Sequence, residues 1–182
     1  MELRHLRQIS PDAITKIDFS DAKEYSELSV DEKREYAGNW EAAVENDALK
    51  ITVSNILKGD VDSVGMPNSG WTWHTHPRGC DNLKNCSIIP PSASDFKQFA
   101  RKNNDWHMVL SKKRIYWIKP RRKYSQKEET LIENFFGKLE EHFGSGKYQH
   151  DQFDEIFTLA LKLSNFFDAF KFKNKKIVFI SE

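Results

Sequence analysis

Alternating apolar and polar positions predict strands in much of the chain. Residues 48–57, ALKITVSNIL, alternate well enough to form a strand, which Gly59 and Asp60 end. Residues 35–44 predict a second strand, in which Gly38 indicates a close approach between two backbones. We expect further strands over residues 71–76, 106–110, 114–118 and 177–180, and a short strand or turn within residues 1–17.

Apolar residues at helical spacing dominate the last third of the sequence. Ser125 and Glu128 have the spacing of a capping box that opens a helix, and Gly144 ends it. Its inward stripe is expected at Leu131, Phe135, Leu139 and Phe143. A second helix is expected over residues 151–170, with an inward face that includes Phe153, Phe157 and Leu161.

Two shorter helices are predicted upstream. Ser92 begins one that runs to about Lys102. The polar residues 18–34 predict another. Ser20 or Asp21 could be its N-cap, and Ser29 and Glu32 have the spacing of a capping box. The order of these elements predicts an α/β fold, a single domain over residues 1–182 with a mixed β-sheet flanked by helices.

Composition and charge narrow the class of protein. A chain of 182 residues is long enough for one good core, and its 13 Phe, 5 Trp and 5 Tyr, which bury large areas, argue against disorder. The net charge of +1 gives no field that would mark a nucleic-acid or membrane binder. No apolar run approaches the roughly 20 residues that span a bilayer, and the first residues lack the apolar core of a signal peptide. We therefore expect a cytoplasmic or other intracellular protein without a membrane partner.

Candidate metal chemistry lies between residues 71 and 96. His74 and His76 point the same way if they lie on a strand, because side chains alternate across it. Asp95, on the helix that follows, can complete a set of three ligands and leave one position open, as in catalytic zinc sites. Ser92 and Asp95 also have capping-box spacing, and both interpretations can hold together. Trp71 and Trp73 fall on the opposite face of the strand, where we expect core packing.

The segment 35–118 resembles the JAMM (MPN/JAB) metalloprotease family. The resemblance rests on His74-Thr75-His76-Pro77, on Ser92-Ala93-Ser94-Asp95, and on Glu35-Tyr36-Ala37-Gly38 upstream. It implies an α/β/α sandwich of the MPN/JAB, cytidine-deaminase-like type, with terminal helices over residues 125–170. It also implies one Zn²⁺ per chain on His74, His76 and Asp95, Glu35 as general base, and Ser92 as a donor to the oxyanion.

By the same resemblance, the expected activity is that of an isopeptidase or deubiquitinase. The expected substrate is a conjugate of ubiquitin or of a ubiquitin-like protein. Two alternatives stay open: a JAMM-type peptidase that cuts ordinary peptide bonds, as in viral or phage protein processing, and a non-catalytic MPN scaffold subunit. Nucleic acid is not the expected partner.

Several assignments within this region also stay open. Glu41 and Glu45 are rivals of Glu35 as the base, and strand parity does not separate Glu35 from Glu41. The 15 residues between His76 and Ser92 are more than the family usually has there. This loop, with Arg78, Cys80 and Cys86, is expected to border the cleft. The two thiols could clamp the loop, bind a second metal or stay unlinked.

A local run of basic residues has two interpretations. An acidic partner or nucleic acid could bind it, and a solvated hairpin edge protected by lysine is the favoured alternative. The run comprises Lys112, Lys113, Arg114, Lys119, Arg121, Arg122 and Lys123.

Overall fold

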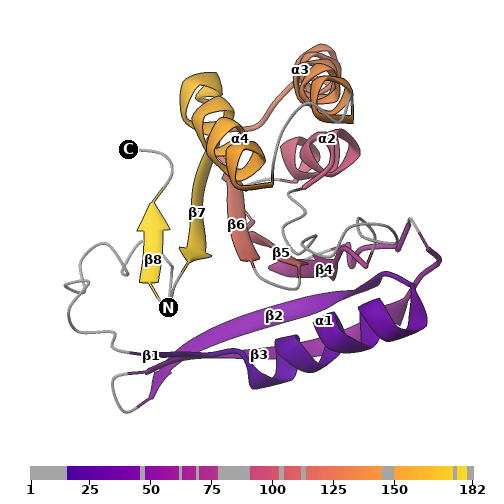
Figure 1. Cartoon of the computed structure of the whole chain (residues 1–182), viewed down its shortest axis with the longest axis vertical. Coiled ribbons are helices and arrows are strands. Elements are labelled where there is room, and N and C mark those ends of the chain that lie inside the picture. Colours follow the sequence, from indigo (N-terminus) through magenta and orange to yellow (C-terminus); the bar gives the residue numbers. More distant parts are fainter. Residues whose placement is uncertain are drawn as a thin grey trace.

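The strands of the computed structural model join into one mixed sheet with helices on both faces (Figure 1). The structure describes residues 16–45, 48–61, 63–68, 70–77, 91–102, 105–111, 114–144, 150–173 and 176–179. Within these residues the elements are β1 (Lys16–Asp18), α1 (Ser20–Glu32), β2 (Tyr36–Glu45), β3 (Ala48–Lys58), β4 (Thr72–Thr75), α2 (Ala93–Arg101), β5 (His107–Ser111), β6 (Arg114–Pro120), α3 (Gln126–Gly144), α4 (His150–Ser164), β7 (Phe167–Lys173) and β8 (Lys176–Phe179).

The strand order is β1-β3-β2-β4-β5-β6-β7-β8. The pairs β1/β3 and β4/β5 are parallel and the other neighbours are antiparallel. The predicted α/β class and mixed sheet are therefore confirmed. No helix in the described part of the chain is both long enough and apolar enough to cross a membrane.

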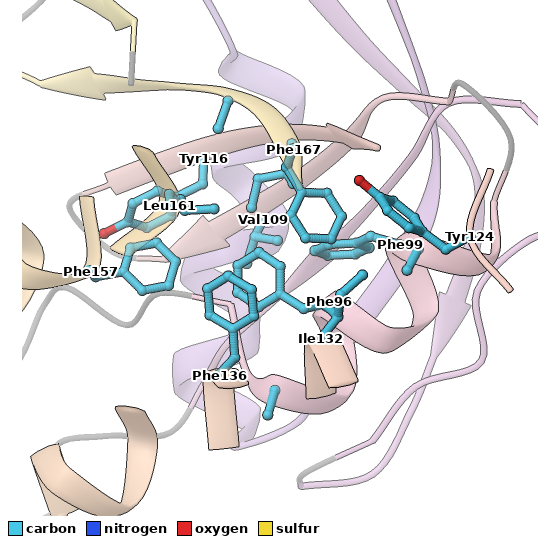
Figure 2. Packing of buried hydrophobic residues seen from close by; sticks show 14 residues of the cluster. Phe96, Phe99, Val109, Tyr116, Tyr124, Ile132, Phe136, Phe157, Leu161 and Phe167 are labelled. Atoms are coloured by element: carbon cyan, nitrogen blue, oxygen red, sulfur yellow. The ribbon is translucent and has the colours of Figure 1, made fainter. Parts of the chain in front are cut away.

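Each face of the sheet carries its own hydrophobic core. Side chains alternate along β5, so that Met108 and Leu110 enter the core that faces α1 while Val109 enters the other. The core on the α1 side is built around Trp40, Trp73 and Trp117. The opposite core is rich in phenylalanine and lies beneath α2, α3 and α4 (Figure 2). This second core fixes α2, the helix that the sequence predicts from residue 92.

Gly38 makes the close backbone approach that the sequence predicts. The register of β2 against β3 shifts between Ala37 and Asn39, which places Gly38 in a bulge. A Cβ atom there would lie 2.5 Å from the Ser54 carbonyl oxygen and 2.8 Å from Trp73 Nε1. Only glycine fits without displacing a backbone, so β2 can pass this tightly beside β3 and β4.

The predicted cap residues of α1 are wrong. The helix runs without a break from residue 20 to residue 32, so Ser29 lies inside it and is not an N-cap. The N-cap is Phe19, without a side-chain cap, and the Ser20 amide donates to Asp18 Oδ1 at 3.0 Å. Ser29 is fully buried and bonds to a neighbouring loop and to β4, contacts that no local spacing reveals.

The helix α3 begins as predicted but buries a different stripe. The Ser125 amide donates to Glu128 Oε2 at 2.9 Å, so the capping box is confirmed. Leu131 and Phe135 are 56% and 40% exposed, while Ile132 and Phe136 are buried. Both pairs have the same four-residue spacing, so periodicity alone cannot choose between them. Stacking of the Phe96 and Phe136 rings, with centroids 3.7 Å apart, selects the buried pair. Leu139 is partly buried against the same core.

The last helix ends earlier than predicted. α4 stops at Ser164, and Asn165 has a positive φ of 56°, the left-handed conformation that ends many helices. The following residues form β7 instead, with Phe167 and Ala169 buried against β6. Phe157 and Leu161 are buried as predicted. The side chains of Phe143 and Phe153, the segment 1–15, and Ile180 lie outside the described residues.

The basic run does not form a solvated hairpin edge. β6 pairs with β5 on one side and with β7 on the other, so it lies inside the sheet. Lys119 is buried with its ammonium 6.0 Å from the Trp106 ring centre. Arg121 pairs with Asp168 at 3.0 Å, and Arg122 pairs with Glu128 at 2.6 Å. Lys112 and Lys113 lie outside the described residues.

Candidate metal centre

The strand β4 places both histidines on one face of the sheet. It is held by β2 on one side and by β5 on the other, and the His76 amide extends the pairing to the Leu110 carbonyl at 3.0 Å. His74 is 1% exposed. Trp73 is buried in the opposite core, where Trp71 also packs, which confirms the predicted alternation.

The two imidazoles and the carboxylate of Asp95 converge on one point. His74 Nε2 lies 2.8 Å from His76 Nε2 and 3.2 Å from Asp95 Oδ1. His76 Nε2 lies 3.1 Å from Asp95 Oδ2. In the part of the chain that the structure describes, this is the one group of its kind that could hold a metal ion.

The spacing of these atoms fits a transition-metal ion. Two ligand atoms at 2.0–2.1 Å from tetrahedral zinc stand roughly 3.3 Å apart. The two distances to Asp95, 3.2 and 3.1 Å, are close to that value, and the 2.8 Å between the imidazoles is about half an ångström shorter, so small side-chain rotations would admit the ion. Two imidazoles and one carboxylate also suit zinc better than calcium or magnesium, which prefer oxygen ligands.

Asp95 is delivered by the first turn of α2. Ser92 is the N-cap, and its amide and hydroxyl both donate to Asp95 Oδ2 at 2.7 Å. The Asp95 amide donates back to Ser92 Oγ at 3.2 Å. The predicted capping box is therefore confirmed. The same turn directs Asp95 Oδ1 toward His74. Asp95 is therefore both part of the helix cap and one of the candidate metal ligands.

The electrostatics favour an ionised carboxylate at this position. Burial by itself would raise the pKa of Asp95. The neighbouring His74 and His76 imidazoles outweigh burial and hold the pKa of Asp95 well below its usual range. A carboxylate that stays ionised when buried is the form that a metal ion requires.

Glu35 shares a cavity with the three candidate ligands. The cavity has a volume of about 320 Å³. It is lined by Glu35, Val61, Ser63, Val64, Met66, His74, His76, Pro77, Ser92, Ser94, Asp95 and Gln98. The rivals Glu41 and Glu45 are exposed on β2 and are absent from this lining. Of the three glutamates, Glu35 is thus the one that the fold brings to the cavity.

A chain of buried hydrogen bonds fixes Glu35 relative to the histidines. Thr75 lies between His74 and His76, and its Oγ1 accepts the Tyr36 amide at 2.9 Å. The same hydroxyl donates to Ser29 Oγ at 2.8 Å, and Ser29 Oγ donates to the Arg34 carbonyl at 2.5 Å. Both neighbours of Glu35 are therefore tied to β4. Sequence reasoning missed the contact between Ser29 and Thr75, since the two residues are 46 positions apart in the chain.

Further backbone bonds hold Glu35 itself. Its amide donates to the Asp60 carbonyl at 2.8 Å, and its carbonyl accepts the Gly59 amide at 2.9 Å. The segment after β3, which supplies Val61 and Val64 to the cavity wall, is thus fixed to the same residue.

Ser92 reaches the cavity, but its hydroxyl is engaged. A serine hydroxyl has a single proton, and here that proton goes to Asp95 Oδ2. To donate to a substrate oxyanion, Ser92 would have to redirect this bond. The exposed hydroxyl of Ser94 lies 3.0 Å from Ser92 Oγ and also lines the cavity. Arg78, Cys80 and Cys86 lie outside the described residues, while Pro77 lines the cavity.

The chain matches no family model and no curated protein. The functional assignment therefore rests on the site residues and their geometry.

Proposed function

We propose that this protein is a zinc-dependent hydrolase of amide bonds, an isopeptidase of the JAMM type. The observation that carries the proposal is the shared cavity: His74, His76 and Asp95 converge on one point, and Glu35 lines the same space. A structural zinc site is closed by four protein ligands, whereas three ligands beside an uncoordinated carboxylate are typical of a hydrolytic site.

Each residue has a distinct task in this reaction. Zinc, when bound to such a set, acidifies water to a pKa of about 7 and polarises a carbonyl group. The Glu35 carboxylate accepts the proton of the attacking water and returns it to the departing amine. His74, His76 and Asp95 hold the ion. Ser92 keeps the Asp95 carboxylate in place through two hydrogen bonds.

The proposed substrate is a conjugate of ubiquitin or of a ubiquitin-like protein, cut at an isopeptide bond. The sequence resemblance supports this choice. The same residues would also act on an ordinary peptide bond, so the substrate test includes both kinds of bond.

The first experiment measures metal. Purified wild-type protein should hold about one zinc ion per chain by elemental analysis, and His74→Ala and Asp95→Ala should lose it. Equal and negligible zinc in wild type and variants would contradict the proposal.

The second experiment measures cleavage. Panels of di-ubiquitin, ubiquitin-like conjugates and unstructured peptides separate the candidate substrates. Glu35→Gln should keep its zinc and lose roughly 10²–10⁴-fold in rate, the usual contribution of a general base. Glu41→Gln is the matched control and should stay active, because Glu41 is exposed and does not line the cavity. Zinc binding without cleavage of any substrate would favour a non-catalytic scaffold.

A further inference from the structure

Three carboxylates of α3 bind α2 along its length. Glu129 Oε2 accepts Arg101 Nε at 2.8 Å, and Glu133 Oε2 accepts Lys97 Nζ at 2.5 Å. Glu140 Oε1 accepts the backbone amide of Ala93 at 2.5 Å. The first two contacts pair opposite charges between side chains. The third is different, because it acts on the backbone at the end of α2 that carries Asp95.

The first turn of α2 has few acceptors for its amides. The opening N–H groups of a helix have no partner inside the helix. The Ser92 amide uses Asp95 Oδ2, and the Asp95 amide uses Ser92 Oγ. The Ala93 amide, in between, uses Glu140, which lies 47 residues further along the chain.

Loss of the Glu140 carboxylate would leave the Ala93 amide without this acceptor. Asp95 has the carboxylate within the same turn. The Ala93 amide would then donate to this carboxylate, in competition with its binding to the metal. Glu140 accepts the Ala93 amide from outside the turn. Asp95 Oδ1 therefore stays directed at His74 Nε2, 3.2 Å away. The stacked Phe96 and Phe136 rings hold the two helices together at this level (Figure 2).

We propose that Glu140 is a positioning residue of the metal centre: by accepting the Ala93 amide, it keeps the Asp95 carboxylate oriented for metal. The inference rests on the metal binding in the proposed function, though not on cleavage. It concerns a residue outside the sequence signature, on a helix that carries none of the ligands.

The test compares two α3 carboxylates by metal affinity. Glu140→Met keeps the side-chain length and removes the acceptor, and Glu140→Gln restores an acceptor oxygen. Glu133→Met is the matched control, since it removes a contact between the same helices at the middle of α2. Zinc dissociation constants come from competition with a chelator, and the absorption spectrum of Co²⁺-loaded protein reports the ligand geometry.

We expect Glu140→Met to bind zinc about 10-fold more weakly or worse, in the range known for residues that orient metal ligands. Its Co²⁺ spectrum should change, while Glu140→Gln and Glu133→Met stay within about threefold of wild type. If Glu140→Met binds zinc as tightly as Glu133→Met, with an unchanged spectrum, the positioning role is wrong.

Two other outcomes would also overturn it. Failure of Glu140→Met to fold, with Glu133→Met folded, would make Glu140 a residue of the fold rather than of the site. A wild type that takes up no zinc would overturn the proposed function itself, and that result is distinct from equal affinities in wild type and variant.

Discussion

At the scale of single residues, the Thr75 side chain links three segments of the chain through its hydroxyl group. Its neighbours His74 and His76 face the cavity, while its hydroxyl faces the other way and joins Tyr36 to Ser29. This junction sets the distance between the strand that carries the metal ligands and the segment that carries Glu35. The position therefore needs a hydroxyl.

Thr75→Val should destabilise the protein while keeping its shape. Valine fills the same volume but leaves the buried Tyr36 amide without an acceptor, which costs about 1–3 kcal/mol in the free energy of unfolding. Urea unfolding of the metal-free protein measures this change. Thr52→Val, at an exposed position of β3, is the control and should stay within about 0.5 kcal/mol of wild type. Equal losses in both variants would refute the role of the hydroxyl.

Individual ligand residues could be predicted from the sequence because their chemistry is local. His74 and His76 are two residues apart, and Ser92 and Asp95 lie in one helical turn. Ser29, Thr75 and Glu140 could not be predicted in the same way. Each acts on a partner that only the tertiary fold brings near, so no spacing in the sequence reveals the contact.

At the scale of elements, the bulge in β2 determines how the strands of the site pass one another. Gly38 lies opposite Trp73 in the register of β2 and β4. The preceding residue, Ala37, lies opposite His74, and Glu35 lies just before the strand.

Gly38→Ala should be much more harmful than the same change at Gly65. The added methyl group at position 38 would meet the Ser54 carbonyl at 2.5 Å, whereas nothing lies within 4 Å of a Cβ at Gly65. Overpacking of this kind typically costs 1–3 kcal/mol. Thermal unfolding of both variants provides the measurement. A Gly38→Ala variant as stable as Gly65→Ala would show that the strands can move apart freely.

Element type was predictable where one pattern dominates, and it failed where two patterns overlap. β2, β3, α2 and the β5/β6 hairpin follow their alternation and cap signals. The predicted helix over residues 151–170 includes residues 167–170, which instead form the start of β7 and pair with β6. On α3, two stripes of equal period compete, and contacts of Phe136 with Phe96, Phe157 and Phe167 decide which is buried.

At the scale of the whole molecule, the candidate site joins parts that belong to different layers. His74 and His76 come from the sheet, and Asp95 comes from the helical layer formed by α2, α3 and α4 (Figure 1). A ligand bound to all three residues favours the state in which these layers are docked.

Zinc should therefore raise the unfolding temperature. At a free concentration 100 times the dissociation constant, a ligand specific to the folded state adds about 2.7 kcal/mol. For a chain of this size, 1 kcal/mol shifts the midpoint by about 2–4 °C, so we expect roughly 5–10 °C. Scanning calorimetry with zinc and with a chelator provides the comparison. Asp95→Ala should show no difference between the two conditions, and an equal zinc shift in that variant would locate the binding elsewhere.

The position of β4 between β2 and β5 has a kinetic consequence. Strands paired on both sides belong to the slowest-opening parts of a protein, so the two imidazoles should keep their positions while other parts of the site move. Asp95 lies on a nine-residue helix, and opening of this helix would disturb the phenylalanine-rich core but break no strand pairing. The rate constant for zinc dissociation should therefore be set by the rate at which α2 separates from the sheet. Zinc transfer to a chelator and deuterium uptake by the α2 amides would then share one rate-limiting motion.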